Sequence, residues 1–380
     1  MKRETIGDLS RGRNNTFDFL RFLLATMVIF SHSFALLYNH TAESFDPLLR
    51  ATGGQAAFGG LAVDGFFLIS GFLITMSWEH CKTTLDFAQR RILRIVPALL
   101  VILGATVFII GPLATTLPLH SYFSSAKTYM YFTMMGTLNL HLTDRLPGVF
   151  TANPLAWRVN GSLWTIRCEL LCYILVAILG LTRGLRRPLL VLLASFTGIG
   201  VFALHGHRAI TTGEFADSLR VLTYFLWGIT FYLYRDRIPH SLPLLIVALA
   251  GMVVSEMTGI LSFTLPILGA YTLFYAALRP VFGLQRFARH GDFSYGLYLY
   301  AFPIEQTLVS RFPHAWNVAT VFFSTFSLAL ICAVLSWHLV EKQFLQLKRK
   351  AEKPVALPEP PAIPLVFNGI KHGGRVGEKL

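Results

Sequence analysis

The sequence predicts an all-α membrane protein, a polytopic bundle of about ten transmembrane helices, and three observations support this. Of the 380 residues, 54% are hydrophobic and 14% are charged, which is too apolar for a soluble protein of this length. Apolar runs of about 20 residues, the length of a helix that crosses a bilayer, recur along the chain. Lys and Arg gather in alternate connections between these runs.

The predicted membrane helices follow from windows of about 20 residues. Short polar connections separate most of them, and no internal repeat is evident. The predicted spans are residues 19–39, 56–78, 93–113, 163–182, 189–205, 218–234, 242–257, 261–278, 293–311 and 317–340.

The distribution of positive charge predicts the topology. An even number of spans places both termini on the same side of the membrane. The segments on that side contain 25 of the 33 Lys and Arg residues, so the positive-inside rule places both termini in the cytoplasm. The net charge of +13 therefore reflects membrane topology, and we expect no nucleic-acid partner.

The same pattern divides the chain into three parts. We expect a cytoplasmic N-terminal segment (1–18), a transmembrane domain (19–345) and a mobile, Lys- and Pro-rich cytoplasmic tail (346–380). The first apolar run lacks a small-residue cleavage site, so we expect it to stay as an anchor. Within the long external connection 114–162, the apolar stretch 127–142 is compatible with a re-entrant or an interfacial course.

The first predicted helix carries polar residues where they are costly. The stretch FDFLRFLLATMVIFSHSF is long enough to cross a bilayer, yet it contains Asp18, Arg21 and His32. Eleven residues place His32 within roughly 20° of Arg21 and about 16 Å further along the same helix face. We therefore predict that Arg21 and His32 share a function, with Asp18 as a possible partner of Arg21.

A polar layer is predicted near the external face. Depths estimated from the span boundaries place His32, Asp64, Glu169 and Glu305 at one level, roughly 10 Å below that face. A carboxylate beside an imidazole sets its tautomer and stabilises its protonated form, as in a catalytic triad. The alternatives are a structural hydrogen bond between helices for Asp64 and a structural position for Glu305.

A cationic layer is predicted near the cytoplasmic face. It comprises Arg21, Arg91 and Arg94, with Arg289 and His290 just before the ninth helix. Arg91 and Arg94 are one helical turn apart, so they can present two guanidinium groups to one phosphate. The alternative for these two arginines is a topology or lipid-headgroup function.

No metal site is predicted. The four cysteines lie in or beside apolar segments and have no metal-ligand spacing with one another or with His. Cys168 and Cys172 share a helix face, and we expect these two to be packing residues.

Six motifs together resemble one protein family. They are FDFLRFLLATMVIFSHS, VDGFFLISGFLI, RRILRIVP, NGSLWTIRCELLCY, FSYGLYLYAFPIEQ and HLVEKQF, and they run in order from residue 17 to residue 344. Each motif is weak alone, but the ordered set resembles the acyltransferase 3 family of integral-membrane acyltransferases, whose members often O-acetylate bacterial polysaccharides.

The resemblance implies roles for particular residues. The family's Arg-x10-His pattern falls on Arg21 and His32 and implies that His32 is catalytic. Its Arg-x-x-Arg pattern falls on Arg91 and Arg94 and implies contact with an acyl-CoA donor. Its Ser-Leu-Trp-Thr-x-x-x-Glu motif ends at Glu169. The chain departs from the family by having Arg167 and Gln343 where Pro is expected.

The implied activity is transfer of an acyl group, most often acetyl in this family, from cytoplasmic acyl-CoA to a hydroxyl of a cell-surface or exported carbohydrate. The implied location is a bacterial inner membrane, with membrane lipids and a free or lipid-linked carbohydrate as partners. His32 acts as general base or accepts the acyl group first, and either Glu169 or Asp64 supports it.

Two questions stay open at this point. Trp157, Trp164 and Tyr173 are candidates for stacking on sugar rings, with an interfacial aromatic belt as the alternative. The alternative function is a proton-coupled transporter of a solute or lipid-linked glycan, because buried acids and a His also serve proton relays. The sequence does not predict an oligomeric state.

Overall fold

The chain is helical throughout the part that the structure describes. The computed structural model describes residues 4–12, 14–38, 46–132, 145–205, 214–279, 281, 283–313 and 315–351. These residues form α-helices joined by short 3₁₀ and π turns, and they contain two isolated β-bridges but no strand. The predicted all-α class is therefore confirmed. The helices are α1 (Ile6–Ser10), α2 (Phe17–Tyr38), α3 (Pro47–Ala51), α4 (Phe58–Glu79), α5 (Thr84–Ala105), α6 (Gly111–Ala114), α7 (Leu119–Ser124), α8 (Ala126–Met130), α9 (Trp164–Leu181), α10 (Pro188–His205), α11 (Glu214–Leu233), α12 (Leu242–Met257), α13 (Leu261–Leu278), α14 (Ser294–Arg311), α15 (Val318–Ser336) and α16 (Lys342–Ala351).

Six helical segments of the described chain are long and apolar enough to cross a membrane. They are Phe17–Tyr38, Phe58–Glu79, Thr84–Ala114, Gly161–Leu181, Leu261–Leu278 and Val318–Gln346. Two shorter apolar helices, α10 and α12, and the less apolar α11 and α14 coincide with the other predicted spans. The count of ten spans and the cytoplasmic position of both termini stay predictions.

The third membrane helix begins earlier than the predicted span 93–113. Helix α5 begins at Thr84, where the Thr83 hydroxyl accepts a hydrogen bond from the Asp86 backbone N–H at 3.1 Å. The first turns of α5 are amphipathic, so a hydropathy window starting at residue 93 misses them. Arg91 and Arg94 consequently lie within a helix. Residues 133–144, most of the stretch predicted as re-entrant or interfacial, lie outside the described residues.

The centre of the bundle is a close contact between α4 and α11. A Cβ atom at Gly71 would lie 2.2 Å from the Phe225 carbonyl oxygen, and one at Gly228 would lie 2.3 Å from the Leu68 carbonyl oxygen. Only glycine allows this approach, as small residues do between membrane helices generally.

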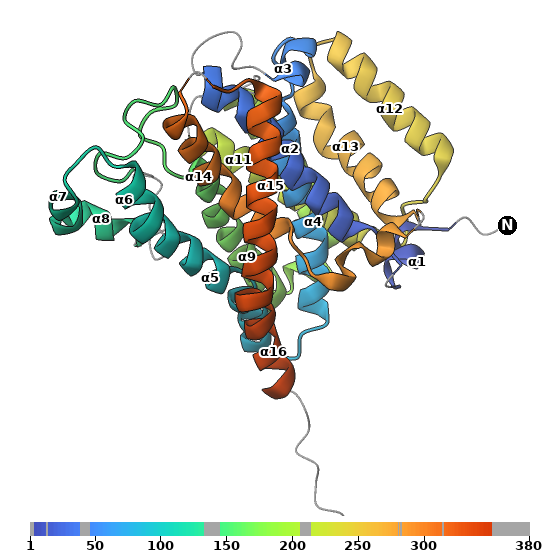
Figure 1. Cartoon of the computed structure of the whole chain (residues 1–380). Coiled ribbons are helices and arrows are strands. Elements are labelled where there is room, and N and C mark those ends of the chain that lie inside the picture. The colour runs from blue at the N-terminus through green and yellow to red at the C-terminus, as the bar shows by residue number, and fades with distance from the viewer. Residues whose placement is uncertain are drawn as a thin grey trace, which may run out of the picture.

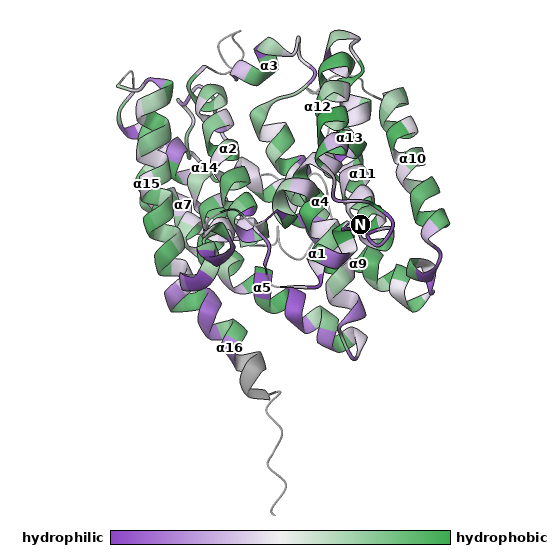
Figure 2. Ribbon diagram, turned by 90° about the vertical axis from the view of Figure 1, so that its right-hand side faces the viewer, coloured by the Kyte–Doolittle hydropathy of each residue, from purple (hydrophilic) through white to green (hydrophobic). Residues whose placement is uncertain are grey.

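Helix α2 runs through the bundle beside α4, α14 and α15 (Figure 1). We name the two ends of the bundle after the ends of this helix, the Phe17 end and the Tyr38 end. Helix α4 runs antiparallel to it, because the ring of Phe58 at its start lies 5.7 Å from that of Phe30. Figure 2 shows hydrophobic residues along most of the long helices and hydrophilic ones concentrated at α16 and the first turns of α5.

Candidate active site

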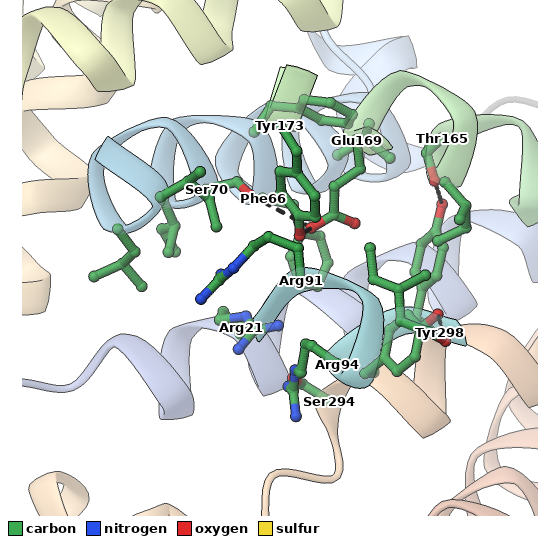
Figure 3. A pocket seen from close by; sticks show the side chains of 18 residues that line it. Arg21, Phe66, Ser70, Arg91, Arg94, Thr165, Glu169, Tyr173, Ser294 and Tyr298 are labelled. Atoms are coloured by element: carbon green, nitrogen blue, oxygen red, sulfur yellow. Dashed lines mark hydrogen bonds between the residues drawn. The ribbon is translucent and has the colours of Figure 1, made fainter. Parts of the chain in front are cut away.

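A cavity of about 130 Å³ lies between α2, α4, α5, α9 and α14. Polar residues that are far apart in the sequence line it. Figure 3 shows three arginines on one side of the cavity and Glu169 and Tyr173 on the other. Among the lining residues that carry polar side chains are Arg21, Ser70, Arg91, Arg94, Thr165, Glu169, Tyr173, Ser294, Tyr295 and Tyr298.

Two of the arginines share one carboxylate. Asp292, just before α14, accepts a hydrogen bond from Arg21 Nη1 on its Oδ2 at 2.8 Å, and the same oxygen accepts one from Arg94. Its Oδ1 accepts from the Ser294 backbone N–H at 3.1 Å and from the Ser294 hydroxyl at 2.5 Å. Burial by itself would raise the pKa of Asp292, but the Arg94 and Arg21 charges outweigh it and hold the pKa below its usual range. Asp292 therefore ties α2 and α5 to the start of α14.

Arg91 is held in a different way. Its Nη2 donates to the Ser77 hydroxyl at 3.2 Å, and its guanidinium lies 5.9 Å from the Phe87 ring centre and 5.8 Å from that of Tyr173. Its Nε is buried and has no hydrogen-bond partner in the described part of the chain. A buried donor without a partner is costly, so Arg91 retains capacity for an anion in the cavity.

Glu169 lies in this cavity beside the arginines. Its Oε1 accepts a hydrogen bond from the Tyr173 hydroxyl and, at 3.5 Å, from Ser70 Oγ. The predicted separation of Glu169 from the cationic layer is therefore wrong. Tyr173, expected near the external face, points its hydroxyl into the cavity instead. The depth estimate fails because it treats helices as upright, whereas tilt and rotation are set by packing.

Asp64 is paired with a cation on a neighbouring helix. Arg220 on α11 donates to Asp64 Oδ1 at 2.7 Å and lies 3.8 Å from Asp217. Asp64 and Arg220 thus lock α4 to α11. Within the described residues no hydrogen bond joins His32 to Asp64 or Glu169, so neither carboxylate occupies the position of a triad acid in this conformation.

His32 lies beyond the cavity, towards the Tyr38 end of α2. Its ring packs edge-on against Phe302 at 5.1 Å between centroids. Its neighbours on α2 are anchored by acids: Ser31 donates to Asp46 Oδ2 at 2.7 Å and Ser33 to Glu305 Oε1 at 2.6 Å. His32 itself is half-buried and available for another partner.

Packed side chains of α14 connect the wall of the cavity to His32. Tyr298 lines the cavity, and its hydroxyl lies 2.7 Å from Thr165 Oγ1 and donates to the Ser162 carbonyl at 3.1 Å. Phe302 follows Tyr298 by one turn of α14 and contacts His32. A Cβ atom at Gly161 would lie 2.8 Å from Phe302, so this glycine leaves room for the ring that supports His32.

Comparison with known families identifies the chain. Residues 14–338 match the family model for the acyltransferase domain of the acyltransferase 3 family. The chain belongs to this family.

Two relatives extend over almost the whole acyltransferase. A protein named O-acetyl transferase from Shigella phage Sf6 is 30% identical over 341 residues, which cover 88% of this chain and 96% of the relative. Nodulation protein 10 from Rhizobium leguminosarum bv. viciae is 28% identical over 372 residues, covering 89% and 95% respectively. No solved structure matches the chain. The predicted family is thereby confirmed.

Two acids beside the arginines of the acyltransferase cavity are absent from the sequence predictions. Asp292 is one, although three arginines in a low-dielectric site require a counter-charge, and the only acid near the start of α14 is Asp292. Arg289 and His290, which were expected in the cationic layer, are exposed and bonded to each other. Buried Glu341, 3.9 Å from Arg94, is a second acid near the cluster.

The described residues of the acyltransferase contain no group of three or more His, Cys, Asp or Glu side chains placed to hold a metal ion. The cavity holds three guanidinium groups, a carboxylate hydrogen-bonded to a phenol, and two further tyrosine hydroxyls, and the imidazole of His32 lies beyond it.

Proposed function

We propose that this acyltransferase is an O-acetyltransferase that moves an acetyl group from cytoplasmic acetyl-CoA to a hydroxyl of a cell-surface or exported carbohydrate in a bacterial inner membrane. The observation that carries the proposal is the arrangement on α2. Arg21 lines an arginine-rich cavity, and His32 stands eleven residues further along the same helix face. The name of the phage relative, O-acetyl transferase, supports acetyl as the group transferred.

The donor is proposed to enter from the Phe17 end, which we assign to the cytoplasm. Its phosphates accept hydrogen bonds from Arg91, whose Nε has no other partner in the described residues. The positive charges of Arg21 and Arg94, which line the same cavity, attract them as well. A cavity of about 130 Å³ is smaller than the roughly 300–1,000 Å³ of sites that enclose a drug-sized ligand. It therefore suits the narrow pantetheine arm, with the nucleotide left at the cytoplasmic mouth.

His32 is proposed to activate the acceptor hydroxyl. The imidazole takes the hydroxyl proton while the oxygen attacks the thioester carbonyl, so that a C–O bond forms and the C–S bond breaks. The proton then passes to the departing thiolate, and His32 returns to its starting state. A route in which His32 carries the acetyl group first needs the same residue and gives the same products.

The test uses purified protein, acetyl-CoA labelled in its acetyl group, and surface polysaccharide from cells lacking the gene, treated with mild base to remove esters. Label is expected in the polysaccharide with the wild type and not with His32→Ala. Transfer that is equal in the two proteins, or absent from both, would refute the proposed function. Folding of the variant is checked by its thermal unfolding in detergent.

A further inference from the structure

The loop before α9 holds an exposed tryptophan in an unusual backbone conformation. Trp157 has φ +69° and Phe150 has φ +52°, both in the left-handed region that residues other than glycine rarely adopt. The Trp157 backbone N–H donates to the Phe150 carbonyl at 3.1 Å, which closes the loop between them. Phe150 is 1% exposed whereas Trp157 is 44% exposed. The fold therefore buries one aromatic ring and presents the other.

Buried amides fix this loop to α14. Asn153 donates to the carbonyl and side-chain oxygens of Gln306, at 2.9 and 2.6 Å, and Gln306 Nε2 donates to the carbonyls of Leu155 and Arg158, both at 2.8 Å. Asn160 donates to the Leu299 carbonyl at 3.0 Å. Strained backbone persists where its surroundings over-determine it, and such places concentrate at functional sites.

The loop lies on the His32 side of the site. The loop is bonded to Gln306, which follows Phe302 by one turn of α14, and Phe302 packs against His32. Arg158, which is exposed, follows Trp157 directly. An exposed cation is costly in hydrocarbon, so this part of the loop faces water or headgroups. A tryptophan that only anchors the chain in the interface would need neither a left-handed backbone nor the amide anchors.

We propose that Trp157 is the stacking surface for a pyranose ring of the acceptor, which it holds with one hydroxyl towards His32. The C–H face of a sugar ring carries partial positive charge and complements the negative face of the indole. Arg158, beside it, donates hydrogen bonds to sugar oxygens. This inference rests on the proposed function, because it names the residue that selects the carbohydrate acceptor.

The test separates acceptor binding from donor binding. Trp157→Gly removes the ring and releases the left-handed backbone, so the loop is expected to keep its fold. With labelled acetyl-CoA and the base-treated polysaccharide, this variant should show a KM for polysaccharide raised about tenfold and an unchanged KM for acetyl-CoA. Trp157→Phe should stay near the wild type. Phe312→Ala, which removes another exposed aromatic at the Tyr38 end of α14, is the matched control and should change neither constant.

This experiment can contradict the stacking function of Trp157 without contradicting the proposed O-acetyltransferase activity. Transfer by Trp157→Gly with an unchanged KM for polysaccharide, or with both KM values raised equally, would overturn the inference and leave the function standing. No transfer by the wild type would overturn both. If Trp157→Gly unfolds, Trp157→Leu, which keeps an apolar side chain without a π face, carries the same comparison with the same expected results.

Discussion

The surroundings of Arg21 and of His32 differ although the two residues share a face of α2. Arg21 is embedded in charge: Asp292 bridges it to Arg94, and Arg91 and Glu169 line the same cavity. His32 meets an aromatic ring, with carboxyl groups bonded to its neighbours Ser31 and Ser33. A cluster of guanidinium groups suits binding of an anionic donor, whereas an imidazole without a bonded carboxylate is able to accept a proton from an acceptor hydroxyl. The difference assigns binding to one region and chemistry to the other.

The largest effect is expected at His32. Loss of a general base typically lowers a rate about 10²- to 10⁴-fold, so His32→Ala should lower kcat by that factor without weakening acetyl-CoA binding. Steady-state rates and direct donor binding measure the two effects. A kcat equal to that of the wild type would place the chemistry elsewhere.

The next largest effect is expected from a change that displaces Phe302, the ring that packs against His32. Gly161→Ala places a methyl group 2.8 Å from Phe302, which must shift and move the imidazole it contacts. Misplacement of a reacting group by about 1 Å costs up to roughly 10²-fold, so kcat should fall roughly tenfold to a hundredfold. Restoring space with Phe302→Leu in the same chain should recover part of the rate. A loss of donor affinity in place of kcat would contradict the separation of the two regions.

At the charged region, Arg91→Ala should raise the KM for acetyl-CoA about tenfold to a hundredfold. Removing a charge-assisted hydrogen bond is worth about 1.5–3 kcal/mol. Arg90→Ala is the matched control because it deletes the same charge on the same helix, where Arg90 pairs with Asp86 and does not line the cavity. Its KM should be unchanged. An equal rise in KM in the two variants would mean that Arg91 makes no specific contact with the donor.

The smallest effect on rate is expected at Asp292, whose influence is on stability. Its pKa in the folded state lies below the unfolded value of about 3.9, so its stabilisation is complete above about pH 4 and is lost as the pH falls through the folded pKa. Asp292→Asn should lower the free energy of unfolding by about 1.5–3 kcal/mol at neutral pH, the usual contribution of hydrogen bonds to a charged group. The difference in unfolding temperature between this variant and the wild type should shrink steadily as the pH falls from 4 towards the folded pKa of Asp292. A difference that stays constant over that range would show that the carboxylate charge is not the cause.

Much of the fold was predictable because hydropathy and length are local properties. Each predicted span coincides with a helix, and the residues of the Arg-x10-His pattern share a face because α2 is continuous. The partners of the charged residues were not predictable. Asp64 pairs with Arg220, and the two arginines pair with Asp292, through contacts between helices distant in sequence. Such pairs depend on how each helix rotates and tilts in the packed bundle, which a single sequence does not encode locally.

The most direct test of the account is the side of the membrane from which each substrate is used. Protein is reconstituted into sealed vesicles, with its orientation determined from the accessibility of an N-terminal tag. Labelled acetyl-CoA is supplied at the Phe17 end and base-treated polysaccharide at the Tyr38 end, or both are supplied at one end. Labelled polysaccharide is expected only when the donor is at the Phe17 end and the acceptor is at the Tyr38 end. Efficient transfer with both substrates confined to the same side would contradict this expectation.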